Sequence, residues 1–219
     1  MPWVGGNYAA YDAADLDRLH GWVDSLGLGG IIISIGSPHD IAAKLNHLQR
    51  RSRLPLLVAA DLEGGSAFRF QGGTPFPTHM GVAATGRDRD AWEMGRVTAI
   101  EGRAAGVHLV FAPVADVNTT PADPIINTRS FGEDPALVAR LVGQAVRGLE
   151  EHGMLSTAKH FPGHGDTETD THIGLLRRAP GRLFALGYGI EGPLMLLLGL
   201  RFFVIRQLTP AVALLLVMA

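Results

Sequence analysis

The stretch Gly29-Gly30-Ile31-Ile32-Ile33-Ser34-Ile35 decides the fold class of this chain. Its β-branched residues predict a strand that is apolar on both faces. Strands buried on both faces are typical of parallel sheets covered by helices. Similar apolar runs predict three later strands, at residues 54–60, 107–112 and 154–158.

Helical segments alternate with these strands. Apolar residues at helical spacing predict helices over residues 13–26 (with Gly27 as the stop), 41–51, 88–105 and 135–151. Residues 37–40 predict a turn before the second helix. The alternation implies a parallel sheet, either doubly wound or closed as a (β/α)8 barrel. No Gly-x-Gly-x-x-Gly opens a helix after a predicted strand, and a Gly-x-x-x-x-Gly-Lys-[Ser/Thr] loop is absent, so a dinucleotide-binding sheet has little support.

Polar residues follow the predicted strands at the point where each strand ends. Asp61 and Glu63 come after the second strand, Asp116 after the third, and Lys159 and His160 after the fourth. Barrel enzymes build their active sites on that face of the sheet. The pattern therefore indicates a functional site there.

Each of these residues alone also fits a structural role. Asp61 could pair with a helix terminus or an arginine, and Lys159 could solvate the end of a strand. Arg129 lies in a turn-rich loop, residues 119–134. A loop of that length in a compact domain is more often functional than structural. The functional interpretation thus depends on these residues occurring together.

The densest polar cluster is the loop at residues 159–172, which we call the histidine loop. Its sequence, Lys-His-Phe-Pro-Gly-His-Gly-Asp-Thr-Glu-Thr-Asp-Thr-His, contains three imidazoles and three carboxylates. Asp170 and His172 lie two residues apart. A carboxylate next to an imidazole can hold one tautomer and tune the ring to exchange a proton near neutral pH. We therefore predict that these two residues carry proton-transfer chemistry.

A metal site is the alternative use of the same loop. Zinc or iron could be bound by nitrogen and oxygen ligands from His160, His164, Asp166, Asp170 and His172. However, Pro162 and Gly163 interrupt any helix that would present two histidines one turn apart. The metal hypothesis remains the minor alternative.

Composition excludes several classes of protein. The net charge of −2 gives no electrostatic reason to expect nucleic acid as a partner. The absence of cysteine removes disulfides and thiolate chemistry. The first residues lack the basic and apolar regions of a secretory signal, so a cytoplasmic location is expected.

The composition changes sharply after Leu176. From Arg177 onward the chain is almost wholly apolar, and Glu191 is the only acidic residue after Asp170. The apolar runs 192–200 and 207–219 are shorter than the ~18 to 20 residues that a membrane-spanning helix needs. Weak membrane association through residues 183–219 is the remaining alternative.

Four motifs in register resemble those of a known family. Lys159-His160-Phe161-Pro162-Gly163-His164-Gly165, followed by Asp170-Thr171-His172, resembles the signature of glycoside hydrolase family 3 in its β-N-acetylhexosaminidase branch. The other three are Asp61-Leu62-Glu63-Gly64-Gly65, Ala112-Pro113-Val114-Ala115-Asp116-Val117 and Asn127-Thr128-Arg129-Ser130-Phe131-Gly132. The resemblance covers residues 3–176.

The resemblance implies a TIM-type (β/α)8 barrel and retaining hydrolysis of terminal β-linked N-acetylglucosamine, for example in peptidoglycan recycling. His172 would be the general acid/base, paired with Asp170. The sugar would be bound by Asp61, Arg129, Lys159 and His160. The substrate would be a small N-acetylglucosaminide, with no metal and no organic cofactor.

Retaining hydrolysis also needs a carboxylate nucleophile. In the family this aspartate follows the histidine loop, whereas this chain has no aspartate after Asp170. A full barrel takes ~250 residues, so residues 1–176 are expected to form a partial barrel of about five βα units with little or no activity. Residues 177–219 would be an apolar tail of uncertain origin. The alternatives are a non-catalytic sugar-binding or membrane-associated module, and a metal-dependent hydrolase.

Overall fold

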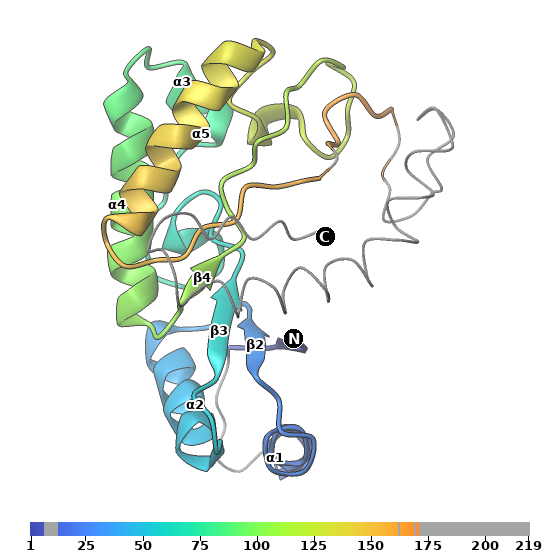
Figure 1. The fold of residues 1–219 in the computed structure, drawn as a ribbon, viewed down its shortest axis with the longest axis vertical. Coiled ribbons are helices and arrows are strands. Elements are labelled where there is room, and N and C mark those ends of the chain that lie inside the picture. The colour runs from blue at the N-terminus through green and yellow to red at the C-terminus, as the bar shows by residue number, and fades with distance from the viewer. Residues whose placement is uncertain (7–12, 162, 169, 171–219) are drawn as a thin grey trace, which may run out of the picture.

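The computed structural model describes residues 1–6, 13–161, 163–168 and 170. They form a parallel sheet with α2, α4 and α5 along one of its faces (Figure 1). The strands are β1 (Trp3–Val4), β2 (Gly30–Ile33), β3 (Leu57–Ala60) and β4 (Leu109–Val110). The α-helices are α1 (Ala13–His20), α2 (Pro38–Arg51), α3 (His79–Ala83), α4 (Asp88–Ala104) and α5 (Pro135–Glu150). A π-helix, η1 (Gly21–Ser25), and two 3₁₀-helices, η2 (Ser66–Phe68) and η3 (Asn127–Arg129), complete the set.

The order of the strands in the sheet is the order of the sequence. β1 pairs with β2, β2 with β3, and β3 with β4, and every pair is parallel. In a doubly wound sheet the strand order reverses at a switch point. The described part of the chain shows no such reversal, which is the winding of a TIM-like α/β fold.

Residues 155–159 extend the sheet beyond β4. The amide of Val110 donates to the carbonyl of Leu155 at 2.9 Å, and the amide of Thr157 donates to the carbonyl of Ala112 at 3.0 Å. The predicted strand at 154–158 thus lies at the expected edge, but it forms only isolated bridges. Pro113 lies opposite this segment and has no N–H to donate, which interrupts the regular ladder.

The other strands are shorter than predicted. Strand β2 stops before the exposed Ile35, and β3 excludes the exposed Leu54. Only Leu109–Val110 of the predicted 107–112 is a regular strand. The sequence did not predict β1 or α3, because two residues and five residues are too few to show a period.

The four predicted helices correspond to α1 with η1, α2, α4 and α5, and most of their boundaries agree with the sequence. The predicted turn at residues 37–40 was wrong, because α2 already begins at Pro38. The hydroxyl of Ser37 accepts the amide N–H of Asp40 at 3.1 Å, and proline suits the first helical turn. The predicted helix 13–26 is α1 followed by η1, and Gly27 follows with φ +62°.

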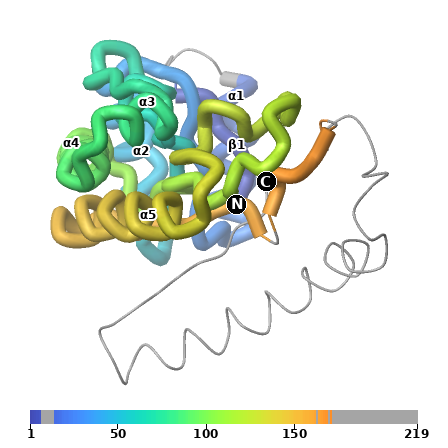
Figure 2. Tube along the Cα trace, turned by 90° about the horizontal axis from the view of Figure 1, so that it is seen from above, coloured from blue at the N-terminus to red at the C-terminus, as the bar shows by residue number. Residues whose placement is uncertain are grey.

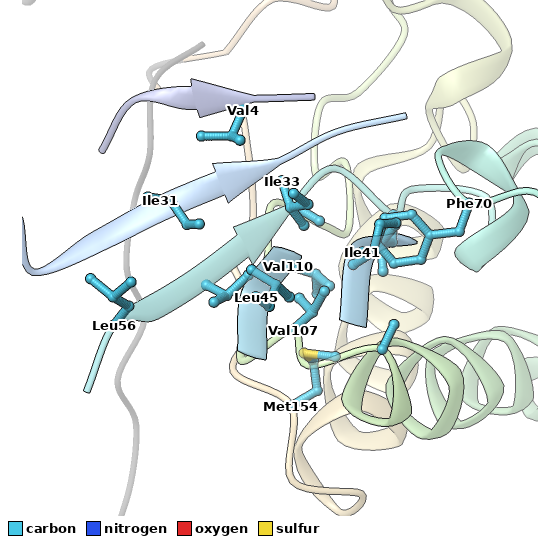
Figure 3. Packing of buried hydrophobic residues seen from close by; sticks show 14 of the residues in the cluster. Val4, Ile31, Ile33, Ile41, Leu45, Leu56, Phe70, Val107, Val110 and Met154 are labelled. Carbon is cyan, nitrogen blue, oxygen red and sulfur yellow. The ribbon is translucent and has the colours of Figure 1, made fainter. Parts of the chain in front are cut away.

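The core lies between the sheet and the helices (Figure 3). Ile31 and Ile33 of β2 pack there with Leu45 of α2. Ile32, between them in sequence, belongs to a small cluster with Ala59, Leu109 and Phe111. This alternation follows from the period of two in a strand, so the second cluster lies on the other face of the sheet.

The helices α4 and α5 lie side by side and approach closely (Figures 1 and 2). A Cβ atom added at Gly95 would come closer than 3.0 Å to the carbonyl oxygen of Ala145. A Cβ atom added at Gly148 would likewise come closer than 3.0 Å to the carbonyl oxygen of Trp92. Glycine is therefore required on both helices at this contact.

The apolar tail predicted at residues 177–219 lies outside the described residues. Within the described ranges, no helix is both long enough and apolar enough to cross a membrane.

Replacing Gly148 with alanine is expected to lower the free energy of unfolding by about 2 kcal/mol, because the two backbones must separate. Gly143 is the matched control on the same helix: it is exposed, and a Cβ there meets nothing within 4 Å. Gly143→Ala should stabilise the chain by about 0.5–1 kcal/mol through helix propensity. Urea unfolding of the three proteins measures both effects, and equal stabilities of the two variants would contradict the packing argument.

Candidate active site

The polar residues gather at the carboxyl ends of the strands. Asp61 and Glu63 follow β3, and Asp116 follows β4 in the chain. Lys159 ends the edge segment, where it bridges to Val114. Parallel strands all end at the same edge of the sheet, so residues from distant parts of the sequence meet there.

Lys159 is the centre of this group. Its side chain is only 4% exposed, and its ammonium lies 2.9 Å from Asp61 Oδ1 and 2.6 Å from Glu63 Oε1. A buried charge is tolerated only when it is paired and hydrogen-bonded. The two carboxylates therefore fix the position of the ammonium group.

Arg129, in the long loop at residues 119–134, is the fourth member of this group. Its Nε and Nη2 atoms donate to the two oxygens of Glu63 at 2.9 and 2.8 Å, the bidentate geometry that guanidinium and carboxylate favour. Its Nη1 atom donates to the carbonyl of Ile125 at 3.0 Å. Glu63 thus joins Arg129 and Lys159. We call Asp61, Glu63, Arg129 and Lys159 the ion-pair network.

The charges of the network hold Glu63 ionised. Burial alone would raise the pKa of this carboxyl. Hydrogen bonds from Arg129 and Lys159, together with their positive charges, outweigh burial and lower the pKa from its ordinary 4.5 to about 2. Glu63 is therefore a permanent anion at neutral pH and does not serve as a proton donor.

Asp116 fixes the orientation of His160. Its Oδ2 lies 2.6 Å from His160 Nδ1 and accepts the amide N–H of the same residue at 3.1 Å. A carboxylate can only accept, so Nδ1 carries the proton. In the neutral ring Nε2 is then an acceptor, and Arg129 Nη2 lies 3.4 Å from it. The peptide bond between Lys159 and His160 is cis.

A second set of contacts holds the loop that follows. Asp116 Oδ1 accepts the amide N–H of His164 at 2.6 Å. The hydroxyl of Thr167 lies 3.0 Å from Asp123 Oδ2 and 2.8 Å from His164 Nδ1. Asp123 is fully buried and also accepts two amide N–H groups, from Ile125 and Ile126. The histidine loop and the long loop are thereby tied together.

A pocket of about 190 Å³ adjoins the network beside Glu63 and Arg129. Its wall includes Phe68, Phe76 and His79. Burial lowers the pKa of His79, so the ring is neutral, and its Nδ1 lies 2.5 Å from the carbonyl oxygen of Arg129. This hydrogen bond holds the backbone of Arg129 in place.

The structure brings together four of the residues that the sequence singled out: Asp61, Arg129, Lys159 and His160. Asp170 belongs to the described chain, whereas its predicted partner His172 lies outside the described residues. Among the residues with described positions, no group of three or more His, Asp or Glu side chains is arranged to hold a metal ion.

Three residues were not predicted as site residues. Glu63 and Asp116 were noted only as polar residues at strand ends, and their central roles depend on partners distant in sequence. Arg69 was not considered at all. Its Nη2 lies 3.7 Å from Asp61 Oδ2, and its guanidinium lies over the ring of Phe68 at 4.5 Å from the centroid. Asp61 therefore contacts cations on two sides, and no local pattern marks Arg69.

Glu63→Gln is expected to lower the free energy of unfolding by about 3–5 kcal/mol at neutral pH, because it leaves buried cations without their anion. The folded-state pKa is below the unfolded one, so this contribution is complete above pH 4.5 and is lost as the pH falls to about 2. This pH-dependent contribution of Glu63 to the free energy of unfolding is on the order of 3 kcal/mol.

Urea unfolding of both proteins across that pH range measures the effect, and their stabilities should converge at the acid end. The exposed Glu133→Gln is the control and should change stability little at any pH. A stability gap between wild type and Glu63→Gln that stays constant with pH would contradict the assignment.

The comparisons with known proteins agree with this geometry. Residues 5–183 match the sequence profile described as the glycosyl hydrolase family 3 N terminal domain. A β-N-acetylglucosaminidase/β-glucosidase of Cellulomonas fimi is 37% identical over 148 residues, 68% of this chain and 26% of that protein. β-Hexosaminidase A of Pseudoalteromonas piscicida is 41% identical over 151 residues, 67% of this chain and 25% of that protein.

A solved structure shares the fold. NagZ of Neisseria gonorrhoeae, in complex with N-trifluoroacetyl-D-glucosamine, has a TM-score of 0.69 and 31% identity, covering 84% of this chain and 56% of NagZ. The chain thus spans about a quarter of the two curated relatives and about half of NagZ. On the profile match and these identities, the chain belongs to glycosyl hydrolase family 3.

Proposed function

We propose that this chain carries the sugar-binding and acid/base parts of a retaining glycosidase that removes terminal β-linked N-acetylglucosamine. The ion-pair network, with its partner His160, is the single observation that carries the proposal. The relatives' names support the substrate: two are called an N-acetylglucosaminidase and a hexosaminidase, and the NagZ structure contains a glucosamine derivative.

The charge balance of the network suits a neutral ligand. Lys159 and Arg129 provide two positive charges, and Asp61 and Glu63 provide two negative ones. Arg69 beside Asp61 and Asp116 beside His160 add one charge of each sign, so the balance is kept. A site for phosphate or another anion has a surplus of positive charge or a helix N-terminus. A balanced site with fixed donors and acceptors is better suited to sugar hydroxyls, which both donate and accept hydrogen bonds.

Each member of the network has a role that its contacts support. Asp61 would accept from sugar hydroxyls, while Lys159 and Arg129 would donate. His160 would accept through Nε2, because Asp116 holds the proton on Nδ1. Because the ion pairs already fix these groups, a bound sugar meets donors and acceptors that need little reordering.

His172 would be the general acid/base, with Asp170 as its partner. An imidazole titrates near neutral pH, and an adjacent carboxylate stabilises its protonated form. The contacts of His164 and Thr167 with Asp116 and Asp123 anchor the loop that leads to this pair. That anchoring supports the proposed role, because a proton donor must be held at a fixed position.

The second catalytic group that a retaining mechanism needs is a nucleophile. A retaining mechanism places a second carboxyl group about 5 Å from the acid/base. Glu191 is the only acid after Asp170 in these 219 residues, and it lies in an apolar stretch. We therefore propose that residues 1–176 form a partial barrel domain, that residues 177–219 form an apolar tail, and that this polypeptide by itself has little or no turnover.

Activity is tested with nitrophenyl β-N-acetylglucosaminide. We expect release of nitrophenol to be at least 10⁴-fold slower than by a complete family member, roughly the loss caused by removing one catalytic group. A complete member assayed in parallel is the positive control. Release at a normal rate that His172→Ala abolishes would show that these 219 residues contain a functional nucleophile.

A sugar-binding module without catalysis is the second candidate, because the ion-pair network is formed in the described residues, whereas no aspartate follows Asp170 in these 219 residues. Titration calorimetry with N-acetylglucosamine should then show binding without turnover. Lys159→Met should weaken binding at least 10-fold, because it leaves Asp61 and Glu63 without the ammonium. The exposed Arg50→Met is the control and should bind like wild type. Equal affinities of all three proteins would remove the network from the binding site.

A further inference from the structure

Two histidines outside the network face each other between α1 and α2. His20 is the last residue of α1, and His47 lies near the carboxyl end of α2. These helices lead into the amino ends of β2 and β3, so the carboxyl ends of α1 and α2 lie at the opposite end of the sheet from the carboxyl ends of its strands (Figure 1). Neither histidine belongs to the motifs of the polar site.

The two rings contact each other through their Nε2 atoms. Nε2 of His20 lies 2.7 Å from Nε2 of His47, and the ring centroids are 5.0 Å apart with a tilt of 33°. In two neutral rings one Nε2 must donate and the other accept. The contact also aims two nitrogens of metal-ligating type at one point.

The spacing is close to that required by a metal ion. With Zn–N bonds of about 2.0–2.1 Å and tetrahedral angles, two imidazole nitrogens lie about 3.3 Å apart. The rings would have to separate by roughly 0.6 Å from their hydrogen-bonded distance. Both side chains are half-buried, so a small side-chain rotation can provide this without repacking the core.

The charged residues next to the pair include Arg50 and Arg51, which end α2. Asp24 is paired with Arg51, which limits the repulsion that this arginine would exert on a bound cation.

We propose that His20 and His47 form a binding site for a divalent transition-metal ion of the zinc type. Imidazole nitrogen suits Zn²⁺, Ni²⁺ and Cu²⁺, whereas Mg²⁺ and Ca²⁺ prefer oxygen. Within the described ranges no third His, Asp or Glu completes the site. The ion cross-links α1 to α2 at the end of the sheet where barrel proteins build stability rather than catalysis.

The test is thermal unfolding of the full chain with and without Zn²⁺. At Zn²⁺ about 100-fold above its Kd, the midpoint should rise by about 5 °C and return on adding a chelator. His20→Gln and His47→Gln should each lose this increment. Mg²⁺ in place of Zn²⁺ should have no effect on wild type.

His39→Gln is the matched control, because His39 is an exposed histidine on α2 and not part of the pair. It should keep the full Zn²⁺ increment. The histidine loop is present in all these proteins, so any Zn²⁺ it binds contributes equally to each. An increment that survives both His20→Gln and His47→Gln, or its absence from wild type, would overturn the proposal.

A second measurement covers the case in which a variant does not fold. Ring ¹⁵N chemical shifts of His20 and His47 in the native chain should move together on titration with Zn²⁺, because the Nε2 lone pair of each ring bonds to the ion and any proton on that nitrogen moves to Nδ1 or to solvent. Shifts that remain those of the metal-free rings at saturating Zn²⁺ would contradict the site.

Discussion

The buried ammonium of Lys159 is the interaction on which the polar end of this structure depends. It joins Asp61 and Glu63, at the end of β3, to a residue 98 positions later in the chain. Removing one partner of such a buried set leaves an uncompensated charge and costs about 3–5 kcal/mol. Arg129 is held by the same Glu63, and His160 follows Lys159 directly, so the positions of both depend on this ion pair.

A balanced group of charges also limits what the site can bind. With its cations already paired, the network offers directed hydrogen bonds rather than a net positive field. This supports the proposal that the site binds the hydroxyls of a sugar rather than a phosphate. Asp116 adds a further constraint, since it sets the tautomer of His160 and holds the start of the histidine loop. One buried carboxylate thus positions His160, a proposed binding residue, and the start of the loop that carries the proposed acid/base.

Much of the fold was predictable because its signals are local. The apolar run at 31–35, the helical spacing over 88–105 and 135–151, and the stop at Gly27 each reflect a short-range rule, and the structure agrees within a few residues. Of the two errors, one has a local cause and the other does not. Ser37 and Pro38 read as a turn, yet in this position they cap and start α2. The strand at 154–158 lost its regular ladder to Pro113, a residue 41 or more positions away from it.

The sequence by itself determined the class of fold, the alternation of strands and helices, and the four motifs that contain most of the site. It could do so because propensity, periodicity and spacing act over a few residues. The tertiary structure alone decided that Glu63 and Asp116 are central, that Arg69 reaches Asp61, and that His20 meets His47. Each of these facts joins residues from separate elements, and which side chains meet is set by the packing of the sheet and helices, not by local pattern.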